Sequence, residues 1–191
     1  MTDLTPDTVV PFIADIFARR GAEEYLGEPV TISEHMLQCA ELAELAGSSD
    51  ALVAAALLHD IGHFTNEFAS DAADHGIDTV HEEAGAKILR DYFPALITDC
   101  VRYHVAAKRY LCATDSAYFG KLSAASVHSL NLQGGPMDAG EVADFAKNPH
   151  LADILQVRIW DDLAKVTDHS APPFAHYQPL LIRVVQQHAK A

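Results

Sequence analysis

The chain has 191 residues, of which 49% are hydrophobic, and 27 acidic against 13 basic residues give a formal net charge of −14. This length and hydrophobic content suffice to bury a sizeable core, and no stretch rich in Pro, Gly or Ser divides the chain, so we expect a single domain over residues 1–191. Because the basic residues form no cluster, a phosphate backbone would be repelled over most of the surface, which argues against nucleic acid as a partner.

The N-terminal sequence and the cysteines bear on where the protein works. The first residues, MTDLTPD, carry neither the basic nor the apolar part of a signal peptide, and the longest apolar run, ALVAAALL, is too short to cross a bilayer. Cys39, Cys100 and Cys112 form no CxxC pair, which fits reduced thiols better than a disulfide framework. We therefore expect a cytoplasmic protein with no membrane partner.

Two amphipathic helices are predicted in the N-terminal part of the chain. Thr5, followed by a proline, opens a helix with apolar residues at helical spacing, and this helix runs to Gly21. The next ten residues have no hydrophobic period and are predicted to form a loop. Thr31 and Glu34 then have the spacing of a capping box, which opens a second helix that continues to about Gly47.

The third and fourth predicted helices carry histidines. Ser49 caps a helix whose apolar run, AALL, continues directly into His59 and Asp60. Thr79 and Glu82 have the spacing of another capping box, which predicts a helix that starts with His81 near its first turn.

The C-terminal half is predicted to be helical as well. One helix follows Pro94 and runs toward Leu111, another starts at Asn148, and a last helix follows Pro172. No stretch shows the alternation that is typical of a strand, so the predicted fold class is all-α. Loops are expected near residues 21–30, 64–78 and 131–137.

Several titratable side chains stand on the apolar faces of these helices. A buried polar group costs about 1–3 kcal/mol unless it has a partner, and one shared cation would partner all of them. A mixture of imidazole and carboxylate ligands suits iron, manganese, zinc or cobalt. The candidate metal ligands are His35, His59, Asp60, His81, His104 and Asp161.

This set of residues resembles the HD-domain superfamily, and its two additional histidines resemble the dinuclear branch of that superfamily. The resemblance implies an all-helical bundle that holds two metal ions, with Asp60 as a bridge between them. Asp161 is preferred to Asp162 because Lys165 follows it by one turn, as in related oxygenases. The implied ligands are His35, His59 and Asp161 for one ion and His81 and His104 for the other.

Most HD-domain proteins are metal-dependent phosphohydrolases of phosphate esters or nucleotides, and that activity stays an alternative. The side chains around the ligands are more similar to the mixed-valence di-iron oxygenases of the PhnZ and TmpB type, which degrade organophosphonates. Tyr25 and Glu28 precede His35 as in the lid of those enzymes, and His63 lies one turn beyond His59. These three residues are the implied catalytic residues.

The same resemblance implies a site for a phosphonate. Lys108 follows His104 by one turn and would supply a positive charge, and the segment SAASVHSLNLQGGPM would supply neutral donors. The implied substrate-binding residues are Lys108, Ser126, Ser129 and Gln133.

The resemblance implies two iron ions, Fe(II) and Fe(III), with O2 as co-substrate, and cleavage of the carbon–phosphorus bond of a 1-hydroxyphosphonate. The implied substrate is (R)-1-hydroxy-2-(trimethylammonio)ethylphosphonate, converted to glycine betaine and phosphate, or its 2-amino analogue, converted to glycine and phosphate. A quaternary ammonium prefers aromatic faces. We favour the trimethylammonium compound because four rings are close to site residues in the sequence, namely Tyr25, Phe64, Phe68 and Tyr103. A binding module that senses a small ligand is a third alternative.

Overall fold

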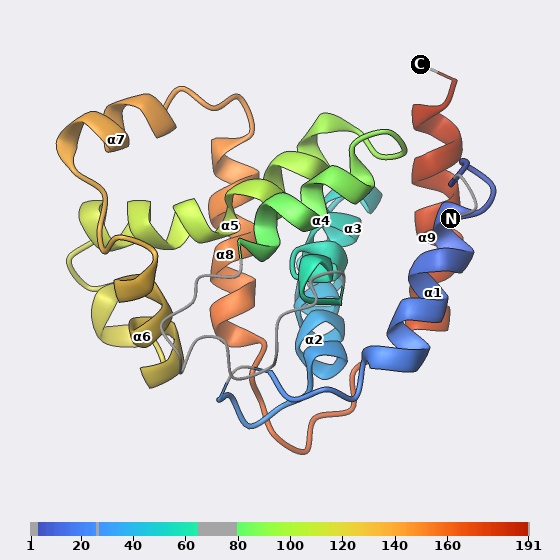
Figure 1. The fold of residues 1–191 in the computed structure, drawn as a ribbon, viewed down its shortest axis with the longest axis horizontal. Coiled ribbons are helices and arrows are strands. Elements are labelled where there is room, and N and C mark those ends of the chain that lie inside the picture. Colours follow the sequence, from blue (N-terminus) through green and yellow to red (C-terminus); the bar gives the residue numbers. More distant parts are fainter. Residues whose placement is uncertain (1–3, 26, 65–79, 191) are drawn as a thin grey trace.

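The computed structural model describes residues 4–25, 27–64 and 80–190 (Figure 1). Within these ranges every regular element is a helix, and the one β-bridge pairs Glu24 with Thr31, so the predicted all-α class is confirmed. The α-helices are α1 (Val9–Arg20), α2 (Ile32–Leu45), α3 (Asp50–Leu58), α4 (His81–Leu89), α5 (Ala95–Thr114), α6 (Ala124–Leu132), α7 (Ala139–Phe145), α8 (Leu151–Leu163) and α9 (Phe174–His188), and the 3-10 helices are η1 (Ile61–Phe64) and η2 (Phe119–Lys121).

Helix α3 is the centre of the bundle. Helices α2, α5, α8 and α9 all pack against it. Helices α1 and α9 lie together on one side of the molecule, near both chain ends, and α6 and α7 lie on the opposite side (Figure 1). Among the described residues, no helix combines the length and the apolar character that a membrane span requires.

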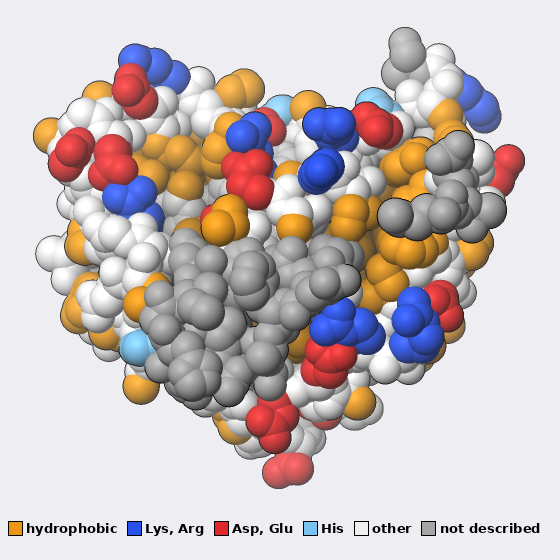
Figure 2. Space-filling model, viewed as in Figure 1, with side chains coloured by type: hydrophobic (Ala, Val, Ile, Leu, Met, Phe, Trp, Pro, Cys, Tyr) orange, Lys and Arg blue, Asp and Glu red, His pale blue; other side chains and the backbone are white. Residues whose placement is uncertain are grey.

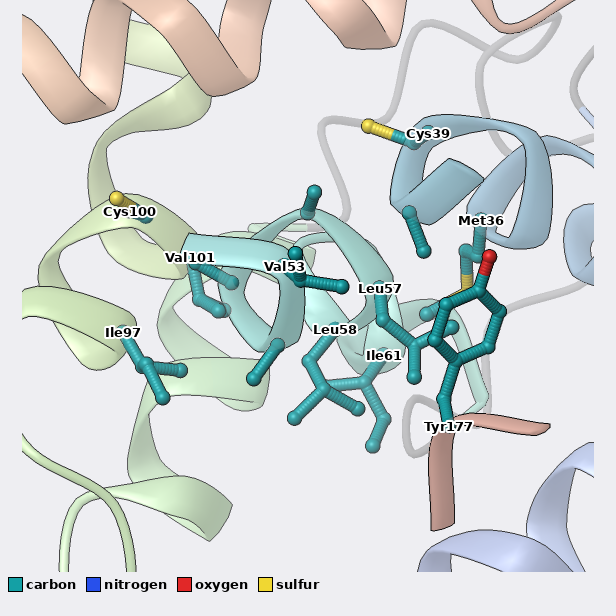
Figure 3. Close-up of a cluster of buried hydrophobic side chains, with 14 of the residues drawn as sticks. Met36, Cys39, Val53, Leu57, Leu58, Ile61, Ile97, Cys100, Val101 and Tyr177 are labelled. Carbon is teal, nitrogen blue, oxygen red and sulfur yellow. The ribbon is translucent and has the colours of Figure 1, made fainter. Parts of the chain in front are cut away.

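The sequence of α3 accounts for its central place. Every side chain from Val53 to Leu58 is buried, so the helix is apolar on all sides near its C-terminal end, as expected of a helix enclosed by others. Figure 3 shows Met36 of α2, Val101 of α5 and Tyr177 of α9 gathered around it. The apolar run therefore brings whatever follows Leu58 into the interior of the protein.

The core joins helices from both ends of the chain. Its buried hydrophobic residues come from α1, α2, α3, α4, α5, α8 and α9, as well as from η1. This supports the single domain expected over residues 1–191, which stays a prediction.

Two of the predicted helix starts are confirmed in detail. Thr31 accepts a hydrogen bond from the backbone N–H of Glu34, and the Glu34 side chain accepts one from the backbone N–H of Thr31, which completes the capping box. Ser49 accepts a hydrogen bond from the backbone N–H of Leu52. Both caps satisfy backbone donors that the helix itself leaves unpaired.

The starts of α1, α4 and α7 were not predicted in this detail. The first helix begins at Val9, because the residues after Thr5 form a turn. The capping box predicted at Thr79 lies outside the described residues, and α4 starts at His81 after Val80, whose backbone is in the left-handed region at φ 48°. No prediction covered the segment around Asp138, where Asp138 and Glu141 form a capping box that opens α7.

The predicted continuation of α3 through His59 and Asp60 is also wrong. The helix ends at Leu58, His59 is its C-cap, and η1 starts at Ile61. The side chains of His59 and Asp60 therefore project from a tight turn between two helices rather than from two faces of one regular helix.

The surface carries acidic and basic side chains close together. On the face shown in Figure 2, Lys and Arg lie in small groups, most of them beside Asp or Glu. Ion pairs of this kind join Arg102 to Glu83 and Arg109 to Glu141.

Gly62 allows η1 to approach the start of α4 more closely than any other residue would. A Cβ atom at this position would lie 1.8 Å from the backbone oxygen of His81 and 2.9 Å from the backbone nitrogen of Gly85. Since both obstacles are backbone atoms, a side chain at position 62 displaces α4, and His81 with it.

We expect Gly62→Ala to lower the free energy of unfolding by about 1–3 kcal/mol, because the added methyl overpacks a backbone contact. Thermal or denaturant unfolding measures this change. Gly120→Ala is the matched control, since a Cβ there meets no atom within 4 Å, and its stability should equal that of the wild type. Equal stability of Gly62→Ala and the wild type would contradict the expected contact.

Candidate metal centre

The six candidate metal ligands come from five helices and meet in the interior. His35 lies on α2, His59 and Asp60 follow α3, and the other three lie on α4, α5 and α8. All six side chains are buried, His81 being the most exposed at 7%. The residues that the structure brings together are His35, His59, Asp60, His81, His104 and Asp161.

Asp60 lies between two pairs of histidines. Its Oδ2 atom is 3.5 Å from Nε2 of His35 and 3.4 Å from Nε2 of His59. Its Oδ1 atom is 3.3 Å from Nε2 of His81 and 3.2 Å from Nε2 of His104. Each carboxylate oxygen thus completes one triad with the spacing of a metal site.

The histidine tautomers are set by backbone carbonyls. A carbonyl oxygen only accepts, so an Nδ1 beside it carries the proton and leaves the lone pair on Nε2, the arrangement found in metal-binding histidines. The three Nδ1 contacts are 2.9 Å from His35 to Ala164, 2.8 Å from His59 to Ala56, and 2.7 Å from His104 to Val101.

These tautomers point ring nitrogens at one another. The Nε2 atoms of His35 and His59 are 3.1 Å apart, and those of His81 and His104 are also 3.1 Å apart. For His35 and His59, two lone pairs at this distance repel each other unless a cation lies between them. The arrangement therefore fits a metal ion at each pair.

Asp161 completes the first group. Its Oδ1 atom is 3.4 Å from Nε2 of His35, whereas Asp162 turns away to Arg158 and Tyr118. Asp60 Oδ2 and Asp161 Oδ1 are buried, and neither has a hydrogen-bond partner within the part of the chain that the structure describes. Unpaired carboxylate oxygens of this kind are costly in the interior, and metal ions would pair both.

Neighbouring side chains keep both carboxylates ionised. Burial alone would raise the pKa of Asp60, but the imidazoles around it, His59 above all, hold that pKa well below its usual value. Burial acts in the same direction on Asp161, and Arg158 followed by His59 lowers its pKa. Both groups are therefore available as anionic ligands.

Tyr25 and His63 cover the metal ligands. The Tyr25 ring stacks on His35 with centroids 4.2 Å apart, and burial together with the charge of Asp60 raises its pKa well above the usual value, so its hydroxyl is neutral. His63 stacks on His81 at 3.9 Å, and its Nε2 is 3.8 Å from Asp60 Oδ1. Burial, followed by the charge of His81, lowers the pKa of His63 well below its usual value.

A group of polar side chains lies beside the metal ligands, on α5, on α6 and after α8. Lys108 donates to Ser129 at 2.7 Å. Lys165 donates to Glu28 at 2.9 Å and to Ser126 at 3.0 Å. Burial, followed by the charge of Arg158, lowers the pKa of Lys108 to about 7. The structure thus brings Glu28, Lys108, Ser126 and Ser129 into one polar network.

Gln133 is the C-cap of α6 and extends the helix face of Ser126 and Ser129. Its Oε1 is buried and finds no hydrogen-bond partner among the described residues.

Sequence reasoning missed three members of these networks. Lys165 entered only as a marker for Asp161, and Ser123, which donates to Glu28 at 2.5 Å, entered only as part of the segment SAASVHSLNLQGGPM and without a role of its own. Gln38, one turn after His35, binds both the N–H and the carbonyl of Val166 and so fixes the segment whose Ala164 carbonyl holds His35. A buried Gln one turn from a ligand was the available signal for Gln38.

The aromatic rings expected around an ammonium group are not gathered here. Phe64 packs edge-on against Phe17 in the core, and Tyr103 packs against Phe145 with Arg102 over its ring. Phe68 lies outside the described residues. Of the four rings, the structure brings Tyr25 to the metal ligands, and its faces are occupied by His35 and by Lys165 at 5.9 Å.

Comparisons with known proteins place this chain in a family and identify relatives with a named activity. The HD-domain family model matches residues 32–131, which is more than half of the chain. The chain is 56% identical over 191 residues, its full length and 97% of the relative's, to [1-hydroxy-2-(trimethylamino)ethyl]phosphonate dioxygenase (glycine-betaine-forming) of Leisingera caerulea. It is 39% identical over 91% of its length, and 86% of the relative's, to hydroxymethylphosphonate dioxygenase of Gimesia maris.

A third relative is an uncharacterized protein of Acanthamoeba polyphaga mimivirus, 33% identical over 92% of this chain and 81% of its own length. The family match, the two phosphonate dioxygenases and the paired His/Asp triads lead to the same conclusion. The chain belongs to the HD-domain family, within its group of phosphonate dioxygenases.

Proposed function

We propose that this protein is a di-iron dioxygenase that converts (R)-1-hydroxy-2-(trimethylammonio)ethylphosphonate and O2 to glycine betaine and phosphate. A single observation carries the choice of substrate: the whole chain is 56% identical to a relative whose name gives that activity. Phe64 and Tyr103 pack elsewhere and do not support this choice of substrate, which rests on the sequence identity to that relative.

The overall reaction balances without a further reductant. The substrate, with net charge of minus one, and one O2 give glycine betaine, hydrogen phosphate and one proton. The carbon–phosphorus bond breaks, the alcohol carbon is oxidised to a carboxylate, and dioxygen is reduced.

Two iron ions in mixed valence, held as the sequence resemblance implies, would supply the redox chemistry and dioxygen activation that side chains cannot provide. The chain supplies their environment. Asp60 offers one oxygen to each triad, and the backbone carbonyls fix the ring orientation of His35, His59 and His104.

The polar network beside the ligands would hold the phosphonate. Lys108 and Lys165 contribute positive charge, and Ser126 and Ser129, to which these lysines now donate, would exchange that contact for a phosphonate oxygen. Gln133 would add an amide from the same helix face. A dianion would also favour the charged form of Lys108, whose pKa burial lowers to about 7.

Tyr25, Glu28 and His63 would close the site over the substrate. Tyr25 is buried against His35, and Glu28 is tied to Lys165 and to Ser123, so the loop before α2 is fastened to α6 and to the end of α8. His63 would hold a proton of the substrate hydroxyl or phosphonate. Exclusion of water by this cover would protect the reactive intermediates.

The first prediction about function concerns the dependence of phosphate release on oxygen. Purified protein loaded with ferrous iron should release phosphate from the trimethylammonium substrate in air and release none under strict anaerobiosis, with about one glycine betaine formed per phosphate. The 2-amino analogue and hydroxymethylphosphonate, run in parallel, rank the substrates. Release at the aerobic rate without oxygen, or turnover of phosphate esters instead, would indicate a phosphohydrolase.

The second prediction concerns the two triads. We expect His81→Ala to bind one metal ion per chain where the wild type binds two, and Asp60→Ala to weaken both sites, because Asp60 faces both pairs of histidines. Metal analysis after removal of loosely bound ions measures the ratio. His150→Ala is the control, since His150 pairs with Asp99 on the surface side of α5 and should keep both ions. Two ions in His81→Ala would refute the assignment.

The third prediction concerns the phosphonate. Lys108→Gln should lower kcat/KM by about 10–100-fold, mainly through KM, since a hydrogen bond to a charged group contributes about 1.5–3 kcal/mol. Steady-state kinetics of the iron-loaded enzyme test this. Lys147→Gln removes an exposed lysine paired with Asp144 and should leave both constants unchanged. An unchanged KM in Lys108→Gln would show that Lys108 does not bind the substrate.

A further inference from the structure

A buried chain of charged side chains ends at Asp161. Arg158 on α8 is 4% exposed, and its Nη1 atom lies 2.6 Å from Asp161 Oδ2. The rest of its guanidinium binds Asp162 through Nε and Nη2. One arginine thus pairs with two adjacent carboxylates, and their negative charges offset the cost of burying its guanidinium.

Tyr118 adds the outer end of this chain. It lies just before η2, is 6% exposed, and donates its hydroxyl to Asp162 Oδ2. Asp162 therefore accepts hydrogen bonds from both Tyr118 and Arg158, and Arg158 also pairs with Asp161, so these contacts connect Tyr118 to Asp161. The four residues are far more buried than a surface ion pair, so solvent screens these contacts little.

The contacts divide the two oxygens of Asp161 between different partners. Oδ2 pairs with Arg158 and lies 3.8 Å from Nε2 of His59, while Oδ1 lies 3.4 Å from Nε2 of His35 and has no hydrogen-bond partner in the described ranges. A guanidinium fork can otherwise take both oxygens of one carboxylate. Asp162 prevents this here, because it occupies the Nε and Nη2 donors of Arg158.

We propose that Tyr118, Asp162 and Arg158 are positioning residues that restrict Asp161 to one metal-facing oxygen, Oδ1. Through these contacts Asp161 would offer Oδ1 alone to an ion held with His35 and His59, and a site at His81 and His104 would not depend on them. This inference rests on the proposed two-metal site, but not on the phosphonate reaction.

The geometry gives each variant a distinct consequence. In Asp162→Asn the guanidinium loses its charged partner and turns to both oxygens of Asp161, so that Oδ1 is no longer free for a metal. In Arg158→Lys a single ammonium replaces the fork, which keeps a positive charge beside Oδ2 and preserves more of the metal affinity than Arg158→Gln does. Tyr118→Phe removes only the hydroxyl that donates to Asp162 and changes the side-chain volume little. It therefore tests the proposal even if the other variants fail to fold.

The experiment is an anaerobic titration of the metal-free full chain with Co2+, followed by visible absorption and chelator competition. We expect two ions in the wild type, and an affinity about 10–100-fold lower for one of them in Asp162→Asn, with the second unchanged. Tyr118→Phe should show the same selective loss with a smaller factor. The cobalt spectrum of the weakened site should also change, which a loss of general stability would not cause.

Matched controls come from contacts remote from Asp161. Tyr177→Phe removes a buried tyrosine hydroxyl that has no hydrogen-bond partner within the described chain, and Glu141→Gln removes the partner of Arg109 between α5 and α7. Both controls should bind two ions with wild-type affinity.

Three results would overturn the inference: wild-type affinity and spectrum in Asp162→Asn and Tyr118→Phe, an equal loss at both sites, or a higher KM for phosphonate with unchanged metal binding. The last result would mean that Arg158 contacts the substrate. A wild type that binds a single ion would instead refute the two-metal proposal. The positioning role of Tyr118, Asp162 and Arg158 would then be judged on the affinity of that ion.

Discussion

The sharing of one buried carboxylate between two pairs of histidines constrains the whole arrangement. Asp60 is 1% exposed, and both of its oxygens lie within 3.5 Å of two imidazole nitrogens. To bring partners to both sides of one side chain, α2, α4 and α5 must converge on the end of α3. The early end of α3 at Leu58 and the lack of a side chain at Gly62 both serve that convergence.

Local signals in the sequence were sufficient to predict the fold class and most helices. The capping residues Thr31 and Ser49 act within one turn, so their effect can be predicted without knowledge of the rest of the chain. The candidate ligands were predictable for a different reason, since a polar residue within an apolar helix face needs a buried partner. The six ligands have no other feature in common, and the structure places all of them together.

What the sequence could not predict depends on contacts between distant segments or on backbone shape. Lys165 meets Glu28 across 137 positions, and neither residue has a local feature that indicates the other. Val80 adopts a left-handed conformation that is unfavourable for a branched side chain, so no propensity would predict this backbone shape just before α4. The start of α7 is different, because the spacing of Asp138 and Glu141 was present in the sequence and was overlooked.

The candidate metal ligands and the polar residues of α6 lie on parts of the molecule that differ in how much they contribute to the hydrophobic core. The candidate metal ligands lie on or directly beside helices of the central core, whereas α6, which carries Ser126, Ser129 and the cap Gln133, supplies no buried residue to that core cluster in the described chain. Apart from the buried Leu130, substitutions on α6 therefore leave the core cluster untouched, while substitutions around Asp60 disturb several helices. Divergence of substrate preference within this group of enzymes then has an accessible route, in which α6 and its flanking turns change while the metal-binding scaffold is inherited intact.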